Sequence, residues 1–117
     1  MYRLKIESSF DAAHKIEGYK GKCSRLHGHS YKVEVFVAGK KLDKIGLLVD
    51  FKDLKDKLNR IIEKLDHNYL NDIKEIGSPS AENISKYIFN KLKFPKNIKL
   101  EKVRVWESHK SYAEYFE

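Results

Sequence analysis

Apolar and polar residues alternate near both ends of the chain. The alternation covers residues 2–7, residues 31–37 and a segment around Val103 and Val105. Because successive side chains of a strand point to opposite faces, a period of two predicts strands with one buried face. Residues 112–116, which follow a short turn, predict a fourth strand.

The period changes in the middle of the chain. Apolar residues recur three and four positions apart, at Phe51, Leu54, Leu58, Ile61, Ile62 and Leu65. This spacing predicts an amphipathic helix with Asp50 as its N-cap. Ser78-Pro79-Ser80 predicts the start of a second helix, with serine as the cap and Pro79 just inside the first turn. Pro95 helps to end that helix.

The predicted order is therefore β-β-α-α-β-β. Hairpins at both ends favour an α+β fold, in which two helices pack on one face of an antiparallel sheet. A length of 117 residues suits a single domain, residues 1–117. Four strands leave two exposed sheet edges, and closing several copies into a barrel would remove them.

Composition narrows the class of protein. The chain is 41% hydrophobic and 35% charged, which is typical of soluble globular proteins. Its clean apolar runs, such as Leu47-Leu48-Val49, are far shorter than the ~20 residues of a membrane span, and residues 2–7 do not resemble a secretory signal. The lone Cys23 excludes an intrachain disulfide. We expect a cytoplasmic protein without a membrane partner.

The formal net charge of +7 favours an anionic partner. Nucleic acid is one alternative, but only four of the 24 basic residues are arginines, and arginine is the residue that reads bases best. The lysines are also scattered among acidic residues, which favours a solvated Lys/Glu surface. We therefore expect no nucleic-acid partner.

Three histidines lie close together in the first quarter of the chain. His27 and His29 are two residues apart, so in a strand they point to the same face, with backbones roughly 6.5–7 Å apart. His14 follows the first strand, and a hairpin would bring it alongside. Three neutral imidazoles without a fourth protein ligand describe an open catalytic zinc site. The alternative is that all three are ordinary polar loop residues.

Three further residues could take part in chemistry near such a site. Cys23 could act as a base or nucleophile, could be a zinc ligand, or could be a small buried residue. Asp66 and His67 follow the first predicted helix and could form an orienting pair, although a histidine at a helix end is also favoured by the helix dipole alone.

Glu107 follows the third predicted strand, on the same face as Val105. A buried acid needs a partner, and two N–H donors on the edge of a guanine or pterin ring would suit a carboxylate. The alternative is a glutamate at a strand end, exposed to solvent.

Six motifs in sequence order resemble those of the 6-pyruvoyltetrahydropterin synthase / 6-carboxytetrahydropterin synthase family. The resemblance covers nearly the whole chain. The motifs are Phe10-Asp11-Ala12-Ala13-His14, Cys23-Ser24-Arg25-Leu26-His27-Gly28-His29-Ser30-Tyr31, Leu48-Val49-Asp50-Phe51, Leu65-Asp66-His67-Asn68-Tyr69-Leu70-Asn71, Pro79-Ser80-Ala81-Glu82-Asn83 and Val105-Trp106-Glu107-Ser108. Ser80 and Ser108 stand where many members have threonine, and both keep the hydroxyl.

The resemblance implies the tunnelling fold, in which such units form trimeric barrels that stack as a homohexamer with active sites between subunits. It also implies the site residues. His14, His27 and His29 would hold Zn²⁺, Cys23 would be the general base, Asp66 and His67 its acid–base partners, and Glu107 the anchor of the pterin ring.

The resemblance further implies a zinc-dependent lyase acting on 7,8-dihydroneopterin triphosphate. Three residues separate Cys23 from His27, a spacing similar to that of the carboxy-forming enzymes of the 7-deazaguanine (queuosine or archaeosine) route. The expected product is 6-carboxytetrahydropterin, with loss of triphosphate and acetaldehyde. The alternatives are a pyruvoyl-forming enzyme, which eliminates triphosphate without cleaving the side chain, and, more distantly, a zinc-stabilised nucleic-acid-binding module.

Overall fold

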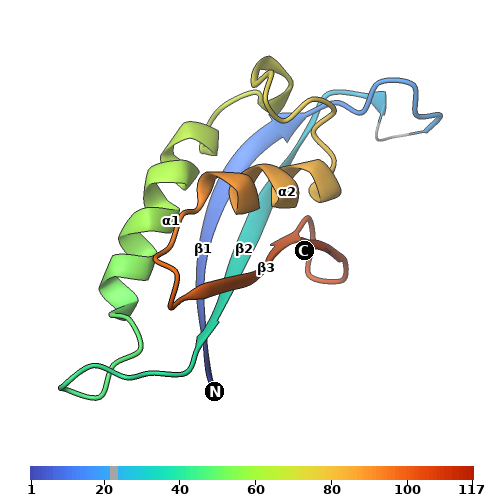
Figure 1. Ribbon diagram of the computed structural model, residues 1–117. Coiled ribbons are helices and arrows are strands. Elements are labelled where there is room, and N and C mark those ends of the chain that lie inside the picture. Colours follow the sequence, from blue (N-terminus) through green and yellow to red (C-terminus); the bar gives the residue numbers. More distant parts are fainter. Residues whose placement is uncertain (22–23) are drawn as a thin grey trace.

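A computed structural model describes residues 1–21 and 24–117 of the chain. Four strands form one antiparallel sheet in the order β1-β2-β3-β4, and two helices cover one of its faces (Figure 1). The strands are β1 (Tyr2–His14), β2 (His27–Gly39), β3 (Lys99–Trp106) and β4 (Tyr112–Tyr115). The helices are α1 (Phe51–Leu65) and α2 (Ala81–Lys91), with a short 3-10 turn, Leu70–Asp72, between them. The predicted α+β class and element order are confirmed.

Strands β1 and β2 are much longer than the alternation predicted. They pair from Tyr2↔Gly39 to His14↔His27, so both strands extend beyond residues 2–7 and 31–37. Ser8 and Ser9 interrupt the apolar pattern of β1, which made the strand look shorter in the sequence. Beyond the serines, Phe10, Ala12 and His14 nevertheless continue the buried face of β1 to its last residue. The long hairpin places the histidines at its far end.

The core lies between the sheet and the helices. Every second residue of β2 faces the helices, beginning at His27 and continuing through Tyr31 to the fully buried Val37. Helix α1 supplies a stripe of buried apolar residues, Leu54, Leu58, Ile61, Ile62 and Leu65. It begins where predicted, because the Asp50 side chain accepts a hydrogen bond from the Lys52 N–H at 2.8 Å. This core holds the strand ends in place.

Helix α2 begins one residue after Ser80, so the prediction that Pro79 lies inside its first turn is wrong. The Ser80 hydroxyl accepts a hydrogen bond from the Asn83 N–H at 3.1 Å and is the N-cap. A proline before the cap remains extended, and its carbonyl is free to bond elsewhere. The Pro79 carbonyl accordingly turns toward the end of β1.

The segment after α1 covers part of the free edge of β1. The His67 N–H donates to the Asp11 carbonyl at 2.6 Å, and the Ala13 N–H donates to the Asn68 carbonyl at 3.2 Å. His67 has a φ of 57°, in the left-handed region that few residues other than glycine adopt. The edge predicted to be exposed is therefore partly closed within the chain.

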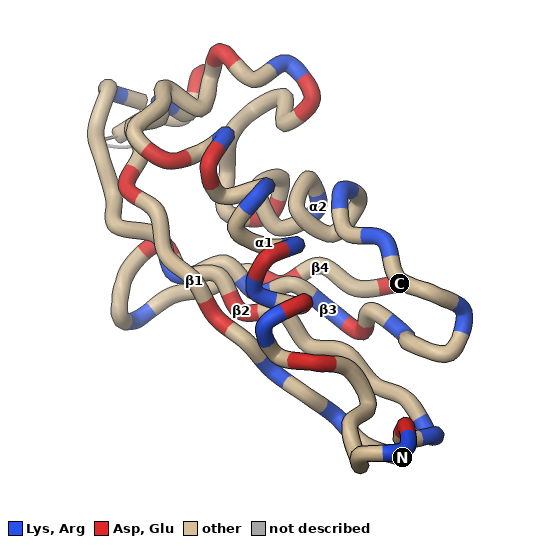
Figure 2. Tube along the Cα trace, turned by 90° about the vertical axis from the view of Figure 1, so that its left-hand side faces the viewer, with Lys and Arg blue, Asp and Glu red and all other residues tan. Residues whose placement is uncertain are grey.

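Acidic and basic residues are interspersed along the chain (Figure 2). On the sheet face away from the helices, the buried Glu34 accepts a hydrogen bond from the Trp106 indole N–H. Its carboxylate also lies 3.4 Å from Lys5 Nζ and 3.6 Å from an Arg104 guanidinium nitrogen. Within the described ranges, no helix has the length and apolar character needed to cross a bilayer.

Candidate metal centre

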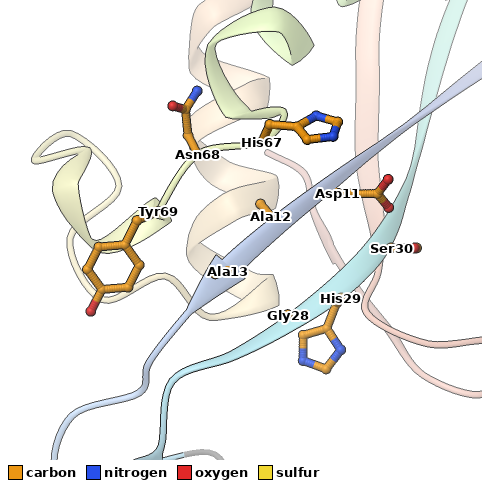
Figure 3. A pocket seen from close by; sticks show the side chains of 9 residues that line it. All are labelled: Asp11, Ala12, Ala13, Gly28, His29, Ser30, His67, Asn68 and Tyr69. Carbon is orange, nitrogen blue, oxygen red and sulfur yellow. The ribbon is translucent and has the colours of Figure 1, made fainter.

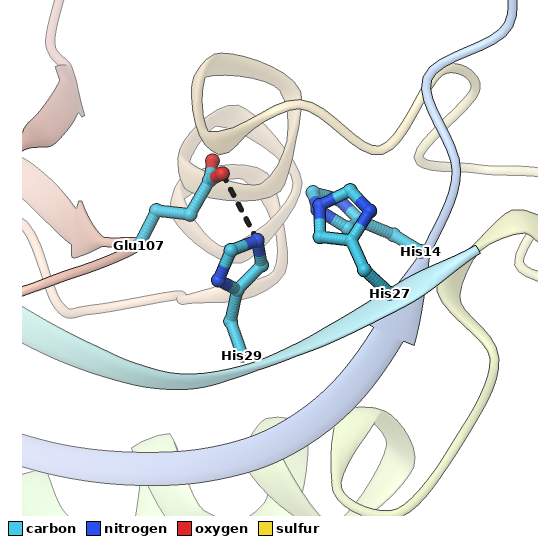
Figure 4. A group of neighbouring side chains, drawn as sticks. All are labelled: His14, His27, His29 and Glu107. Carbon is cyan, nitrogen blue, oxygen red and sulfur yellow. Dashed lines mark hydrogen bonds and ion pairs between the residues drawn. The ribbon is translucent and has the colours of Figure 1, made fainter. Parts of the chain in front are cut away.

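Four potential ligands converge where β1, β2 and β3 end on the helix side of the sheet. His14 and His27 occupy paired positions, His29 lies two residues further along β2, and Glu107 follows β3 directly (Figure 4). Each offers one ligand atom, and these atoms all lie within 4.8 Å of one another. The long register of the hairpin is what brings residues 14 and 27 together.

Backbone carbonyls select the tautomers of two of the imidazoles. His14 Nδ1 lies 2.7 Å from the Pro79 carbonyl, and His27 Nδ1 lies 2.6 Å from the Arg25 carbonyl. Because a carbonyl can only accept, each neutral ring carries its proton on Nδ1 and has a lone pair on Nε2. Metal-binding histidines usually show this pattern: one ring nitrogen donates its N–H to a neighbouring acceptor, and the other ring nitrogen binds the metal.

The two lone pairs face each other. His14 Nε2 and His27 Nε2 lie 3.0 Å apart, and two unprotonated nitrogens cannot form a hydrogen bond with each other. Tetrahedral zinc–nitrogen bonds of about 2.0–2.1 Å place neighbouring ligand nitrogens roughly 3.3 Å apart. A cation bound to both nitrogens would satisfy them with little rearrangement.

His29 supplies a third ring nitrogen. Its Nε2 is buried and makes no hydrogen bond within the described part of the chain, although a Glu107 carboxylate oxygen lies 3.1 Å away. Burial lowers the pKa of His29, and the neighbouring imidazoles add to this effect, against the opposing influence of the Glu107 carboxylate. The ring is therefore neutral near pH 7 and able to bind a cation.

The group can therefore hold a metal ion. Three imidazoles and one carboxylate suit Zn²⁺ and several other divalent first-row metals. If the imidazoles bind the ion, Glu107 is either a fourth ligand or a neighbouring carboxylate that is free for other contacts.

Tyr31 lies beside the metal ligands and was not singled out in the sequence. Its fully buried ring stacks on Phe10, with centroids 4.8 Å apart, and meets the His29 ring edge-on at 5.4 Å. The hydroxyl is buried without a hydrogen-bond partner among the described residues. Burial, and then the charge of Glu107, raise the pKa of Tyr31, so its hydroxyl stays protonated. Its position two residues after His29 was the available signal.

Asp66 and His67 form the predicted pair. His67 Nδ1 lies 3.0 Å from one Asp66 carboxylate oxygen, and the other accepts a hydrogen bond from the Asp11 N–H at 2.9 Å. The Asp11 N–H and then the His67 imidazole lower the pKa of Asp66. The His67 side chain is 79% exposed, so it is open to proton exchange.

This pair is not part of the histidine cluster of its own chain. His67 borders a cavity of about 560 Å³ along the covered edge of β1, lined by Asp11, Ala12, Ala13, Gly28, His29, Ser30, His67, Asn68 and Tyr69. The imidazoles of His67 and His29 point away from each other (Figure 3). Cys23 lies outside the described residues, so its predicted place beside the metal remains a prediction.

Comparison with known proteins gives a consistent family. A family model described as 6-pyruvoyl tetrahydropterin synthase matches residues 3–117. A Synechocystis protein named 6-carboxy-5,6,7,8-tetrahydropterin synthase is 40% identical over 121 residues, which cover 99% of this chain and 94% of that protein. A Pyrococcus furiosus protein named dihydroneopterin monophosphate aldolase is 36% identical over 111 residues, covering 92% and 90%.

The fold is also similar to that of solved structures. The structure of Caenorhabditis elegans 6-pyruvoyl tetrahydropterin synthase superposes with a TM-score of 0.85 at 26% identity. The match covers 99% of this chain and 95% of that one. The sequence match and the structural match to this family therefore both cover almost the full length of the chain.

Proposed function

Because the chain belongs to the 6-pyruvoyl tetrahydropterin synthase family, we propose that it is a zinc-dependent 6-carboxytetrahydropterin synthase. Its substrates would be 7,8-dihydroneopterin triphosphate and one water molecule, and its products 6-carboxytetrahydropterin, triphosphate and acetaldehyde. The observation that carries the proposal is the convergence of three imidazole side chains. In two of them, a hydrogen bond from Nδ1 to a backbone carbonyl leaves Nε2 with a free lone pair. The name of the Synechocystis relative supports the choice of product.

His14, His27 and His29 would hold the zinc ion. Bound there, Zn²⁺ would supply Lewis-acid chemistry, stabilising negative charge on the side-chain oxygens of the substrate. The carbonyls of Pro79 and Arg25 would keep two of the rings oriented when substrate exchanges.

Glu107 would hold the pterin ring. A carboxylate can accept two parallel N–H bonds from an amidine-like ring edge, which fixes orientation as well as position. Glu107 lies beside the histidine cluster, with a carboxylate oxygen 3.1 Å from His29 Nε2. A ring anchored there would present its side chain to the metal ligands, which is the orientation that the reaction needs.

Cys23 would take a proton from the substrate side chain, and Asp66 and His67 would move a second proton. The Asp66 carboxylate keeps its charge to low pH and orients the His67 ring. Since this pair points away from the cluster of its own chain, we propose that it completes the site of a neighbouring subunit in a homohexamer. The free edges of β1 and β4 are the surfaces through which subunits would join.

The test is to incubate the zinc-loaded protein with 7,8-dihydroneopterin triphosphate and identify the products by mass. Release of acetaldehyde together with 6-carboxytetrahydropterin is expected. Formation of 6-pyruvoyltetrahydropterin without acetaldehyde would identify the pyruvoyl-forming activity instead. No conversion of the substrate would refute both activities.

A second candidate is aldol cleavage of dihydroneopterin monophosphate. It is favoured by the Pyrococcus furiosus relative, which carries that name at 36% identity over 92% of this chain. The same assay with the monophosphate separates the two. Consumption of the monophosphate with the triphosphate left intact would establish the aldolase and exclude the carboxy-forming synthase.

A further inference from the structure

Tyr31 has a buried hydroxyl that its own chain does not use. The residue is fully buried, and its hydroxyl meets no partner among residues 1–21 and 24–117. An unpaired buried hydroxyl is less favourable than the phenylalanine of the same shape, because it has lost its hydrogen bonds to water without replacing them. The protonated oxygen is therefore a hydrogen-bond donor for which the described residues supply no acceptor.

The register of the sheet indicates the acceptor. Lys32 pairs with Trp106 and Val33 with Val105, so continuing the same register by one residue places Tyr31 opposite Glu107. Directly opposed residues share a face, with Cβ atoms about 4.5–5.5 Å apart. Both side chains also flank His29, since the Tyr31 ring lies 5.4 Å from its ring and a Glu107 oxygen lies 3.1 Å from its Nε2.

We propose that the Tyr31 hydroxyl is the donor that positions the Glu107 carboxylate once the site is filled. A Glu107 carboxylate oxygen lies 3.1 Å from His29 Nε2. When a cation takes that nitrogen, the carboxylate loses this contact and needs another partner. A hydrogen bond from Tyr31 to one carboxylate oxygen leaves lone pairs on both oxygens for the two N–H groups of a ring. Tyr31 is thus a positioning residue, not a catalytic one.

This inference rests on the proposed function, in which Glu107 holds the pterin ring. The experiment measures the Kd of neopterin for the zinc-loaded full chain by calorimetry. It compares the wild type, Tyr31→Phe, Glu107→Gln and the double variant. Tyr31→Phe removes one oxygen and keeps the ring that stacks on Phe10. Tyr87→Phe, which changes a buried tyrosine on α2 away from the site, is the matched control.

Tyr31→Phe is expected to weaken neopterin binding about tenfold, the effect of losing one hydrogen bond to a charged group. Its zinc content should equal that of the wild type. In the Glu107→Gln background the same change should weaken binding less than about twofold, because the two residues act as one unit. Tyr87→Phe should bind neopterin like the wild type.

A second readout does not depend on the ligand. In the metal-free protein, Tyr31→Phe should raise the thermal midpoint by about 2–4 °C, because the unpaired hydroxyl is gone. An unchanged or lower midpoint would mean that the hydroxyl already has a partner, which contradicts the inference.

The outcomes separate this inference from the proposed function. Wild-type protein that binds no neopterin and converts no pterin substrate would overturn the proposed function, and this inference with it. If Glu107→Gln weakens binding while Tyr31→Phe binds like the wild type, only the inference about Tyr31 fails. It also fails if the effect of Tyr31→Phe is undiminished in the Glu107→Gln background.

Discussion

His14 and His27 each donate one ring N–H to a backbone carbonyl, and their remaining nitrogens face each other at 3.0 Å. If both rings are neutral, their Nε2 lone pairs face each other and repel. A proton or a cation between the two nitrogens removes this repulsion. Near neutral pH, a divalent cation bound by three imidazoles stabilises these nitrogens more than a single shared proton does. Metal binding should therefore stabilise the fold as well as enable chemistry.

Replacing one of these rings should abolish metal binding and turnover together. We expect His27→Ala to lose its zinc after dialysis and to convert no substrate, measured by metal analysis and product mass. The matched control is His67→Asn, outside the cluster, which should keep its zinc and lose turnover. A His27→Ala protein with full zinc content and activity would contradict the assignment of the site.

Cys23 is tested by the same two measurements. If it is the general base, Cys23→Ala should keep its zinc and lose turnover, because the three imidazoles hold the ion without it. Loss of zinc from this variant would instead identify Cys23 as a ligand.

At the scale of the elements, the start of α2 connects the helix to the metal centre. Ser80 caps the helix, and the preceding Pro79 carbonyl holds the His14 ring. A small displacement of the cap would therefore move a proposed metal ligand. The sequence indicated a serine cap with Pro79 inside the helix, whereas the structure places Pro79 before the cap, with its carbonyl bonded to His14.

Ser80→Ala should lower the free energy of unfolding by about 1 kcal/mol, the usual effect of removing an N-cap side chain. Ser80→Thr keeps the hydroxyl and should be close to neutral. Ser78→Ala is the matched control and should unfold like the wild type, because Ser78 contributes its carbonyl, which accepts from the Asn83 amide. Urea unfolding midpoints measure all three, and equal losses for Ser78→Ala and Ser80→Ala would contradict the cap assignment.

Glu34, on the sheet face away from the helices, should make the free energy of unfolding depend on pH in the acid range. Burial alone would raise the pKa of Glu34, but the Trp106 N–H, Lys5 and Arg104 together hold it below the ordinary value of 4.5. The unfolded chain therefore takes up a proton at a higher pH than the folded protein. Stability from this group is complete above about pH 4.5 and is lost as the pH falls through the folded pKa.

Urea midpoints between pH 6 and pH 3 should fall for the wild type and fall less for Trp106→Phe, which lacks the N–H donor. Glu63→Gln, a change on the exposed face of α1, should follow the wild-type curve. If Trp106→Phe and the wild type lose stability equally, the Trp106 N–H does not stabilise the Glu34 carboxylate.

Local patterns predicted much of the fold and part of the site. Alternation located parts of β1, β2 and β3, and the spacing of His27 and His29 placed them on one face. What the patterns missed depends on long-range contacts. Ser8 and Ser9 hid the length of β1, and the unpaired Tyr31 hydroxyl is visible only when the sheet register and its neighbours are known.

At the scale of the whole molecule, the chain holds the two halves of the proposed chemistry apart. The histidine cluster and the Asp66–His67 pair form two separate groups, and the imidazoles of His29 and His67 point away from each other. Homo-oligomers with closed symmetry bring different surfaces of neighbouring copies together. A ring of subunits would therefore unite the two groups from different copies.

Mixing inactive variants tests this arrangement. If each site uses two subunits, His27→Ala and His67→Asn proteins that are unfolded and refolded together should recover activity at about a quarter of their sites, by random assortment. Each variant refolded alone is the control and should stay inactive. Failure of the mixture to regain any activity, despite mixed oligomers detected by mass, would contradict a shared site.

The left-handed backbone at His67 also restricts how this position can change during evolution. At a φ of 57°, glycine, asparagine and aspartate are tolerated, whereas branched residues are strongly disfavoured. None of these three offers a group that exchanges protons near neutral pH as an imidazole does. Random drift at this position would therefore pass first through proteins that keep the architecture and have lost the reaction, and such descendants would be free to acquire a different use.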